Sequence, residues 1–321
     1  MAAVRLACRR ELAGAGPVVL VACSGGADSL ALLAGTVFES RKAERRVVGV
    51  TVDHGLQPGS GEHAARVVEQ MAGLGADETV AVTVGVESRG QGPEAAAREA
   101  RYAVLEEVSR RFGDARVLLG HTLDDQAETV LLGLTRGSGA RSLAGMRRAF
   151  APFSRPLLDV TRAETEAACR AERIEWWTDP HNEDPRFTRS RVRHRVLPVL
   201  EAELGPGVTA ALARTADALA EDAAVLDELT AQAWERVRRD GGGLAVEGLA
   251  DLAAGIRQRV LRRAALEAGA LPGDLFRVHV LAMDELVTGW RGQQQVDLPG
   301  HLHLVRSGGE LVFRPAPGRE R

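Results

Sequence analysis

The chain has 321 residues, of which 45% are hydrophobic and 26% are charged, and its formal net charge is −3 at pH 7. This length allows two domains, and the near-neutral charge excludes a surface that is basic throughout, so any affinity for nucleic acid must come from local patches. The three cysteines, Cys8, Cys23 and Cys169, include no Cys-x-x-Cys pair, which argues against a structural zinc site or a paired-thiol redox centre. Because free thiols persist in reducing compartments and no apolar run reaches membrane length, we expect a cytoplasmic protein without a membrane segment.

The first predicted strand leads into a candidate phosphate-binding loop. After a short helix expected within residues 1–16, the apolar run Val18–Ala22 is followed by Ser24, Gly25, Gly26, Ala27, Asp28 and Ser29, and then by a helix-compatible segment. A glycine-rich turn between a strand and a helix binds anions, because the backbone can approach the ligand and free N–H groups point at it. An ordinary glycine turn with Asp28 as a helix cap is the alternative.

Two residues of this region, Asp28 and Lys42, limit the classes of phosphate-binding protein that the loop can belong to. Asp28 would repel a bare phosphate, so its position predicts a Mg²⁺ ion between the two. The only lysine of the chain, Lys42, lies beyond the helix, so the loop lacks the lysine of a Walker A motif. A P-loop NTPase and a Schiff-base enzyme are therefore both disfavoured.

The pattern of strands and helices continues over roughly the first 180 residues and predicts a doubly wound parallel α/β sheet. Further strands are expected at Arg46–Val52, Thr79–Val86 and Arg116–Gly120, with a fifth strand or its exit within Ala149–Val160. Ligands of such sheets bind at the carboxyl ends of the strands. Asp53 and His54, directly after the second strand, are therefore candidate nucleotide-binding residues, although a packed loop histidine explains His54 equally well.

The strand at Arg116–Gly120 is followed by a second acidic group, Asp124, Asp125 and Glu128. Asp125 and Glu128 are three residues apart, so a helix would place them on one face. The helix macrodipole favours acids in any first turn, which accounts for Asp124 and Asp125 but less well for Glu128.

A basic segment follows the predicted sheet. Five of the ten residues from Arg186 to Arg195 are arginine and none is acidic, which is typical of a contact with nucleic-acid phosphates. A solvated helix face is the alternative. The candidate phosphate contacts are the arginines of this segment together with one from a glycine-rich loop, namely Arg136, Arg186, Arg189, Arg191, Arg193 and Arg195.

The remainder of the chain predicts a connecting helix and a second, smaller domain. Helical spacing over Val208–Arg239 is followed by three glycines at 241–243, so we expect domains at 1–204 and 244–321 with a linker at 205–243. The second domain is expected to be mostly helical. It should end in a hairpin around Arg306-Ser-Gly-Gly309, formed by strands at Val296–Leu304 and Glu310–Phe313.

Taken in order, these motifs resemble those of the tRNA(Ile)-lysidine synthetase family of PP-loop ATP pyrophosphatases. The resemblance rests on blocks spread along most of the chain, namely Ser24–Ser29, Val52–Gly55, Glu94–Tyr102, Gly120–Thr129, Arg136–Gly139, Arg155–Leu158 and Asp179–Pro198. The sequence departs from the family pattern at three positions. The family usually has histidine where Thr122 stands and asparagine where Ser190 stands. It usually has serine or threonine where His181 stands.

The resemblance implies a two-step reaction that uses ATP and Mg²⁺. The wobble cytidine of the isoleucine tRNA with a CAU anticodon is adenylated at carbon 2, and free L-lysine then displaces AMP. The implied catalytic residues are Asp28, Asp125 and Glu128. Asp28 and Asp125 would hold Mg²⁺, whereas Asp125 and Glu128 would hold the lysine amine. The implied ATP-binding residues are Ser24–Ser29, Asp53 and His54. The tRNA would contact the arginines and the C-terminal domain. Whether the protein forms a homodimer stays open.

Three other interpretations stay open at this point. A PP-loop tRNA thiolase would need positioned cysteines, and an amide-forming ATP pyrophosphatase would need a glutaminase domain or partner. A non-catalytic adenine-nucleotide-binding protein would not require Asp28, Asp125 and Glu128 together.

Overall fold

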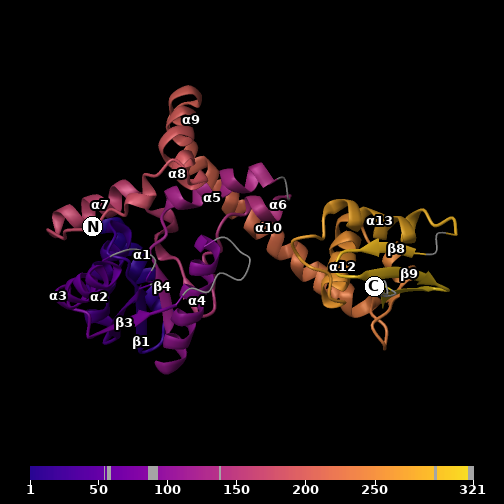
Figure 1. Cartoon of the computed structure of the whole chain (residues 1–321), viewed down its shortest axis with the longest axis horizontal. Coiled ribbons are helices and arrows are strands. Elements are labelled where there is room, and N and C mark those ends of the chain that lie inside the picture. Colours follow the sequence, from indigo (N-terminus) through magenta and orange to yellow (C-terminus); the bar gives the residue numbers. More distant parts are fainter. Residues whose placement is uncertain (54, 56–58, 86–92, 137–138, 293–294, 317–321) are drawn as a thin grey trace. The chain divides into compact units, whose positions relative to one another are not determined.

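The computed structural model describes the chain except for residues 54, 56–58, 86–92, 137–138, 293–294 and 317–321 (Figure 1). The described residues divide into two compact units, Met1–Leu219 and Ala220–Arg321. One long helix, α10 (Val208–Val237), begins in the first unit and ends in the second. It corresponds to the predicted connecting helix.

A six-stranded sheet forms the centre of the first unit, in the order β3-β2-β1-β4-β6-β5. Its strands are β1 (Val18–Ala22), β2 (Arg46–Asp53), β3 (Glu78–Thr83), β4 (Arg116–Leu119), β5 (Ala149–Phe150) and β6 (Phe153–Ser154). All neighbouring pairs are parallel except β5 with β6. The predicted parallel sheet is therefore confirmed, and the fifth strand expected within Ala149–Val160 is a short antiparallel pair followed by a 3₁₀ helix, Pro156–Asp159.

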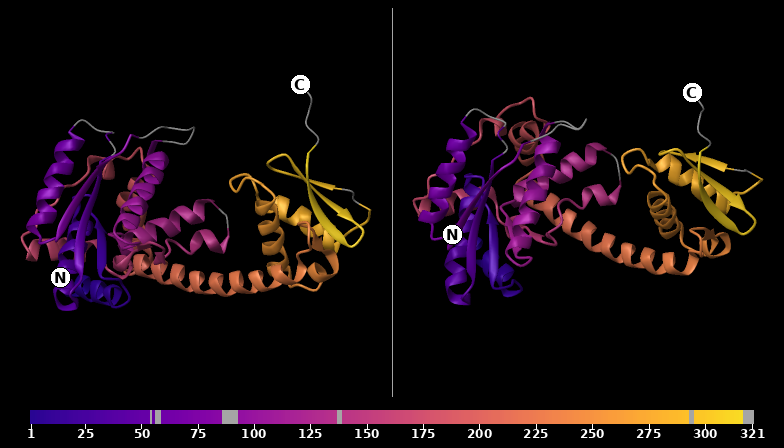
Figure 2. Two further views of the ribbon diagram at one scale, coloured as in Figure 1. Left: turned by 90° about the horizontal axis from the view of Figure 1, so that it is seen from below. Right: turned by 60° about the horizontal axis from the view of Figure 1, so that its bottom comes forward.

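Helices cover both faces of this sheet, as the two views of Figure 2 show. Because side chains alternate along a strand, Val19 and Val21 of β1 belong to one buried cluster and Leu20 to another. The first cluster includes residues of α1 (Ala2–Ala13), α2 (Ala27–Ala43), α3 (Ser60–Gly73) and α7 (Arg162–Ala171). The second includes residues of α4 (Pro93–Arg111).

The order of the strands determines where a ligand can bind. The chain runs outward from β1 through β2 to β3 and then returns to form β4 on the other side of β1. Open α/β sheets bind ligands at such a switch point, outside the carboxyl ends of the strands. The loop after β1 and the start of α5 (Leu123–Arg136) after β4 both lie at this edge.

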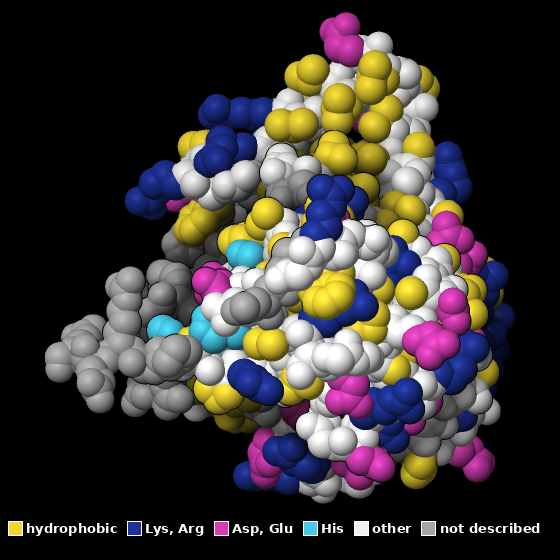
Figure 3. Space-filling view, turned by 90° about the vertical axis from the view of Figure 1, so that its right-hand side faces the viewer, with side chains coloured by type: hydrophobic (Ala, Val, Ile, Leu, Met, Phe, Trp, Pro, Cys, Tyr) yellow, Lys and Arg dark blue, Asp and Glu magenta, His cyan; other side chains and the backbone are white. Residues whose placement is uncertain are grey.

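The basic segment of the first unit is helical. From Thr188 onward it comprises α8 (Thr188–Arg191) and a π-helical turn (Val192–Val196), and α9 (Leu197–Leu204), which contains no basic residue, follows directly. The short α6 (Ala140–Leu143) lies earlier in the chain. Apolar side chains gather on α9, at the upper tip of Figure 3, where Val199 is 57% and Leu204 is 72% exposed.

Among the described residues no single helix is long and apolar enough to cross a membrane. The bent pair Thr188–Leu204 and Val208–Val237 meets the length and composition criteria only when taken together.

The second unit packs helices against a four-stranded antiparallel sheet of order β7-β10-β9-β8. Its elements are β7 (Leu244–Ala245), α11 (Val246–Ala250), α12 (Ala254–Glu267), α13 (Arg277–Thr288), β8 (Gln295–Leu298), β9 (Leu302–Ser307) and β10 (Glu310–Pro315). The predicted hairpin is present as β9 and β10. The single strand expected at Val296–Leu304 was wrong, because Gly300 has a φ of +86° and turns the chain between β8 and β9.

The carboxylate of Glu201 on α9 caps the first turn of α10. It accepts hydrogen bonds from the backbone N–H groups of Gly207 (2.7 Å), Val208 (3.3 Å) and Thr209 (2.7 Å) and from the Thr209 hydroxyl (2.6 Å). The first N–H groups of a helix have no acceptor within the helix, so an external carboxylate satisfies them. These bonds, first of all that from the Thr209 hydroxyl, lower the pKa of Glu201 to about 2.

We expect Glu201→Gln to destabilise the protein at neutral pH and to matter less in acid. The folded-state pKa lies below the ordinary value of 4.5, so the stabilisation is complete above that value and is lost as the pH falls toward about 2. Urea unfolding of both proteins between pH 7 and pH 3 measures this difference. Glu203→Gln, a change at an exposed position of the same helix, is the control. A destabilisation by Glu201→Gln that stays constant with pH would contradict the capping role.

Candidate active site

The glycine-rich loop between β1 and α2 is closed by hydrogen bonds among its own residues. The Ser29 hydroxyl donates to the Gly26 carbonyl (2.9 Å) and accepts from the Ser24 backbone N–H (3.2 Å). Gly25 has a φ of +82°, which residues with a Cβ rarely adopt. Ala27, Asp28 and Ser29 form the first turn of α2. The loop is thus a preformed concave turn at a helix N-terminus, the arrangement that binds phosphate groups.

Two residues that the sequence did not single out support this loop from outside. His63 Nε2 donates to the Ser24 carbonyl (2.9 Å), and the Trp177 backbone N–H donates to the Gly25 carbonyl (2.9 Å). The two rings lie 4.2 Å apart between centroids. They come from α3 and from the segment after α7, so no local pattern could have revealed these contacts.

The three predicted catalytic acids lie together with three arginines in one group, which we call the charge cluster: Asp28, Asp125, Glu128, Arg162, Arg189 and Arg193. The group joins the first turn of α2 to α5, α7 and the basic segment. Residues that are far apart in the sequence therefore meet at the switch point of the sheet. Its three carboxylates and three guanidinium groups balance in charge.

Glu128 has no exposed surface and is held by arginines. Its carboxylate accepts from Arg189 Nε (2.7 Å) and from Arg193 Nε (2.7 Å), and Arg162 lies 3.6 Å away. A buried carboxylate without such partners would be strongly destabilising. The acid therefore depends on the basic segment.

Asp125 is bonded on both sides. Thr122 donates to one carboxylate oxygen through its backbone N–H (2.9 Å) and its hydroxyl (3.1 Å), and Arg162 donates to the other (2.9 Å). Burial alone would raise the pKa of Asp125, but Arg162 and Arg189 outweigh it, so the pKa is lowered. Asp125 is thus an anion at neutral pH.

Among the three acids of the cluster, Asp28 has the fewest close arginine partners for its negative charge. Its carboxylate accepts from the Thr165 hydroxyl, and Arg162 Nε lies 3.7 Å away. Burial raises the pKa of Asp28 to about 6, although the Thr165 hydroxyl and Arg162 both act in the opposite direction. Among the described residues, no three His, Cys, Asp or Glu side chains are arranged to hold a metal ion. Two carboxylates suit a Mg²⁺ ion that arrives with phosphate ligands, because Mg²⁺ typically takes one or two carboxylates together with substrate phosphates.

Arg162, which the sequence analysis missed, contacts all three acids of the cluster. Its backbone N–H also donates to Asp124 (2.7 Å). Thr161 and Glu164 form a capping box of the Thr-x-x-Glu type, which places Arg162 in the first turn of α7. That motif located the residue in the fold, but nothing in the sequence indicated what its side chain contacts.

His121, at the end of β4, is neutral and has a defined tautomer. Burial lowers its pKa to about 4. Arg155 Nε donates to His121 Nδ1 (3.3 Å), so the ring proton is assigned to Nε2. Arg155 also donates to the Tyr102 hydroxyl (3.0 Å), as does Arg98 (3.3 Å).

The structure separates the predicted phosphate-contacting arginines into two groups. Arg189 and Arg193 are four residues apart on one helical face and turn toward the charge cluster. Arg186 pairs with Asp184 (2.6 Å), and Arg191 donates to the carbonyl of Pro185 (2.7 Å). Arg195 is exposed. Whether these side chains contact RNA stays a prediction.

The other predicted residues are described only in part. Asp53 accepts a hydrogen bond from the Gly55 backbone N–H (2.9 Å) at the end of β2. His54 lies outside the described residues, as do the side chains of Arg136 and His181. Ser190 is buried.

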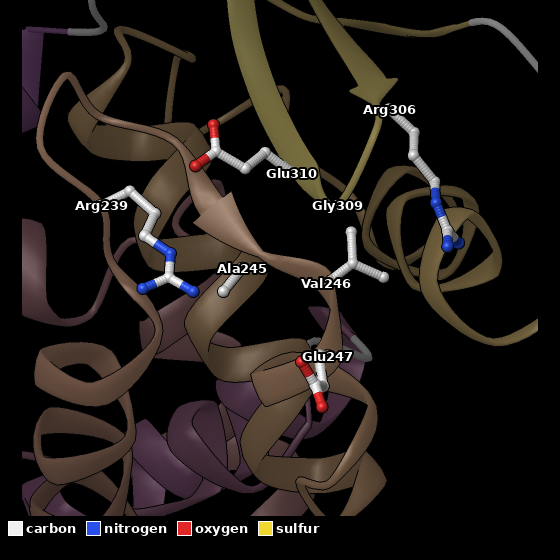
Figure 4. Close-up of a pocket in the computed structure, with 7 residues that line it drawn as sticks. All are labelled: Arg239, Ala245, Val246, Glu247, Arg306, Gly309 and Glu310. Carbon is white, nitrogen blue, oxygen red and sulfur yellow. The ribbon is translucent and has the colours of Figure 1, made fainter.

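The second unit has a cavity of about 550 Å³, shown in Figure 4. None of its lining residues was a predicted site residue. They include two basic and two acidic side chains and are Arg239, Ala245, Val246, Glu247, Arg306, Gly309 and Glu310. Its mixed charge distinguishes it from a purely basic phosphate site.

The parallel sheet, the glycine-rich loop after β1 and the acid in the first turn of α2 define a PP-loop protein. The PP-loop domain family matches residues 11–200, and the TilS substrate binding domain matches residues 244–312. The chain belongs to the tRNA(Ile)-lysidine synthase family.

Curated relatives support this assignment over almost the whole chain. The tRNA(Ile)-lysidine synthase of Streptomyces coelicolor is 54% identical over 93% of this chain and 85% of its own length. That of Thermobifida fusca is 54% identical over 97% of both chains. Among solved structures, the U34-tRNA thiolase NcsA from Methanococcus maripaludis, with its [4Fe-4S] cluster, has a TM-score of 0.58. It is 19% identical over 68% of this chain and 78% of its own, and this likeness shows the fold alone.

We expect Gly25→Ala to lower the free energy of unfolding by about 1–3 kcal/mol. The substitution would strain the positive φ, and its Cβ would lie 2.8 Å from Val67 Cγ2 and 2.9 Å from His63 Cε1. Gly26→Ala is the matched control, because its φ is −79° and its Cβ would meet the Ser24 hydroxyl at an ordinary 3.5 Å. Denaturant unfolding measures both changes. Equal losses would show that the loop does not depend on the conformation of Gly25.

Proposed function

We propose that the protein ligates free L-lysine to carbon 2 of the wobble cytidine in tRNA(Ile) with a CAU anticodon, releasing AMP and pyrophosphate from ATP. The observation that carries this proposal is the position of Asp125 and Glu128 on one face of α5, beside Asp28 of the glycine-rich loop. The match to tRNA(Ile)-lysidine synthases along most of the chain supports it.

In the first step, the loop would bind the phosphates of ATP through its backbone N–H groups and the hydroxyls of Ser24 and Ser29. The carbonyl oxygen on carbon 2 of cytosine attacks the α-phosphorus, and pyrophosphate leaves. Asp28 and Asp125 would hold a Mg²⁺ ion, which would offset the charge on the departing pyrophosphate. Asp53, at the end of the neighbouring strand, and His54, the next residue in the sequence, are proposed to contact the nucleotide.

In the second step, the lysine amine attacks carbon 2, and the bond from that carbon to the oxygen of AMP breaks. Lysine is an ammonium ion at neutral pH, with a reference pKa near 10.4, so the site must bind the cation and accept a proton. Asp125 and Glu128 are the anions available for both tasks. His121 is neutral there and provides a hydrogen-bond donor at Nε2.

Arginines of the first unit and, separately, the second unit are proposed to contact the tRNA. Arg186, Arg191 and Arg195 are the candidate phosphate contacts of the basic segment, with Arg136 at the end of α5. The homodimer that the sequence left open has one feature in its favour, because the apolar side chains of α9 would gain from burial against a second copy.

The thiolase interpretation lacks a reactive cysteine. Cys8, Cys23 and Cys169 are all buried. Burial raises the pKa of Cys8 and of Cys23 to about 12, and that of Cys169 to about 11. A thiol must ionise to act as a nucleophile, so none of the three suits sulfur transfer.

Incubation of the purified protein with unmodified tRNA(Ile), ATP, Mg²⁺ and lysine should convert the wobble cytidine to lysidine. Mass analysis of the digested nucleosides detects the product, and release of AMP should match it mole for mole. Methionine tRNA with the same anticodon and reactions without lysine are the controls. Absence of lysidine with a folded protein and intact tRNA would reject the proposed function.

Asp28→Asn should reduce AMP formation on the order of a hundredfold, as loss of other preorganised charge-stabilising groups does. The amide keeps the shape of the side chain and can still accept from Thr165, so unfolding should change little. Pyrophosphate release in the presence of tRNA is the measurement. Asp114→Asn, at an exposed turn with a positive φ that asparagine tolerates, is the control. Near-normal release would mean that Asp28 holds no metal.

A further inference from the structure

The carboxylates proposed to hold the lysine amine are already occupied by arginines of the same chain. Arg193 donates to both oxygens of Glu128, at 2.7 and 3.1 Å, and Arg189 donates to one of them at 2.7 Å. Asp125 accepts from Arg162 at 2.9 Å and from Arg193 at 3.2 Å, while Thr122 occupies its other oxygen. A carboxylate has about four acceptor positions, so little capacity is left for an ammonium group.

Charge balance gives the same result. The cluster contains three acids and three arginines, and its members are largely buried. One more cation in a low-dielectric neutral cluster is unfavourable, because it enters without a compensating anion. Lysine therefore requires an arginine to leave its carboxylate.

Arg189 is the member most able to leave. Its side chain is 35% exposed, compared with 22% for Arg162 and 21% for Arg193. Arg189 makes one hydrogen bond to a carboxylate, that of Glu128, and a second to the Asp125 backbone carbonyl (3.3 Å), and it lies 3.5 Å from the Asp125 carboxylate. Arg193 makes three hydrogen bonds to the carboxylates of Glu128 and Asp125, and Arg162 lies close to all three acids. Glu128 would keep Arg193 as a partner after Arg189 moved.

A phosphate group is the ligand that can draw Arg189 away. The planar guanidinium group binds phosphate through two parallel hydrogen bonds as readily as it binds carboxylate. Asp28 of the glycine-rich loop belongs to the same cluster, so a nucleotide bound to that loop would bring phosphates near it. The backbone of a bound RNA offers the same chemistry.

We propose that Arg189 occupies the amine site in the ligand-free protein and is released from Glu128 by a phosphate group, so that lysine binds after the phosphate-bearing substrate. This inference rests on the proposed function, because it concerns the site of the lysine amine. It makes Arg189 a residue that determines the order of substrate binding.

Calorimetric titration of the full chain with L-lysine tests the proposal in four states: alone, with Mg²⁺ and an ATP analogue that resists cleavage between the α- and β-phosphates, with tRNA(Ile), and with both. We expect at least one phosphate source to tighten lysine binding about tenfold or more, within the usual range of coupling between sites. The separate arms show whether the phosphate comes from nucleotide or RNA. Equal affinity in all four states would overturn the proposal.

Variants of Arg189 separate this coupling from a simple change in charge. Arg189→Gln should bind lysine without any phosphate source, and added analogue or tRNA should then change the affinity less than about twofold. Arg189→Lys keeps a cation beside Glu128 and should keep the dependence on phosphate. Arg170→Gln removes an arginine paired with Glu166 outside the cluster and should behave as wild type. Coupling that persists undiminished in Arg189→Gln would overturn the proposal, because charge alone would then explain any gain in affinity.

Unfolding curves establish that each variant is folded, and the lysidine assay is run in parallel. Lysidine formation by a wild-type protein without coupling would reject only the role of Arg189. Absence of lysidine would reject the proposed function itself.

Discussion

The buried carboxylate of Glu128 is the constraint on which the active-site region depends. An isolated charge in a protein interior costs several kcal/mol, so this acid must be paired wherever the chain places it. Its partners come from α8 and the π-helical turn, with Arg162 of α7 close by. Through Arg162 the same group reaches Asp28 at the start of α2. Because Arg189 and Arg193 both pair with this acid, the basic segment stabilises the fold as well as the site.

Balanced charge also shapes what the site can bind. A neutral cluster does not attract a free ammonium group strongly, because it has no net negative charge to offset the cation. The neutral His121, whose Nδ1 accepts from Arg155, adds a polar contact without disturbing that balance.

The arginine-rich segment shows why residue type alone does not define a role. Five arginines within ten residues predict an RNA contact. Because the net charge of the chain is near neutral, any affinity for RNA must come from such a local patch. Their helical arrangement gives the side chains different surroundings, however. Arg189 and Arg193 pair with buried acids, while Arg195 is exposed to solvent. A guanidinium group binds carboxylate and phosphate with the same geometry, so the sequence could not distinguish the two uses.

Local patterns in the sequence determined most of the elements and the nature of the phosphate loop. The apolar runs, the glycines at 25 and 26 and the capping box of Thr161 and Glu164 act over a few residues, so their consequences can be derived without the fold. One local prediction failed at Gly300, where the turn interrupts an otherwise strand-like run. Only the tertiary structure decided which side chains meet, because contacts such as Glu128 with Arg189, Asp28 with Thr165 and Ser24 with His63 join elements that are brought together by the packing of the sheet and its helices.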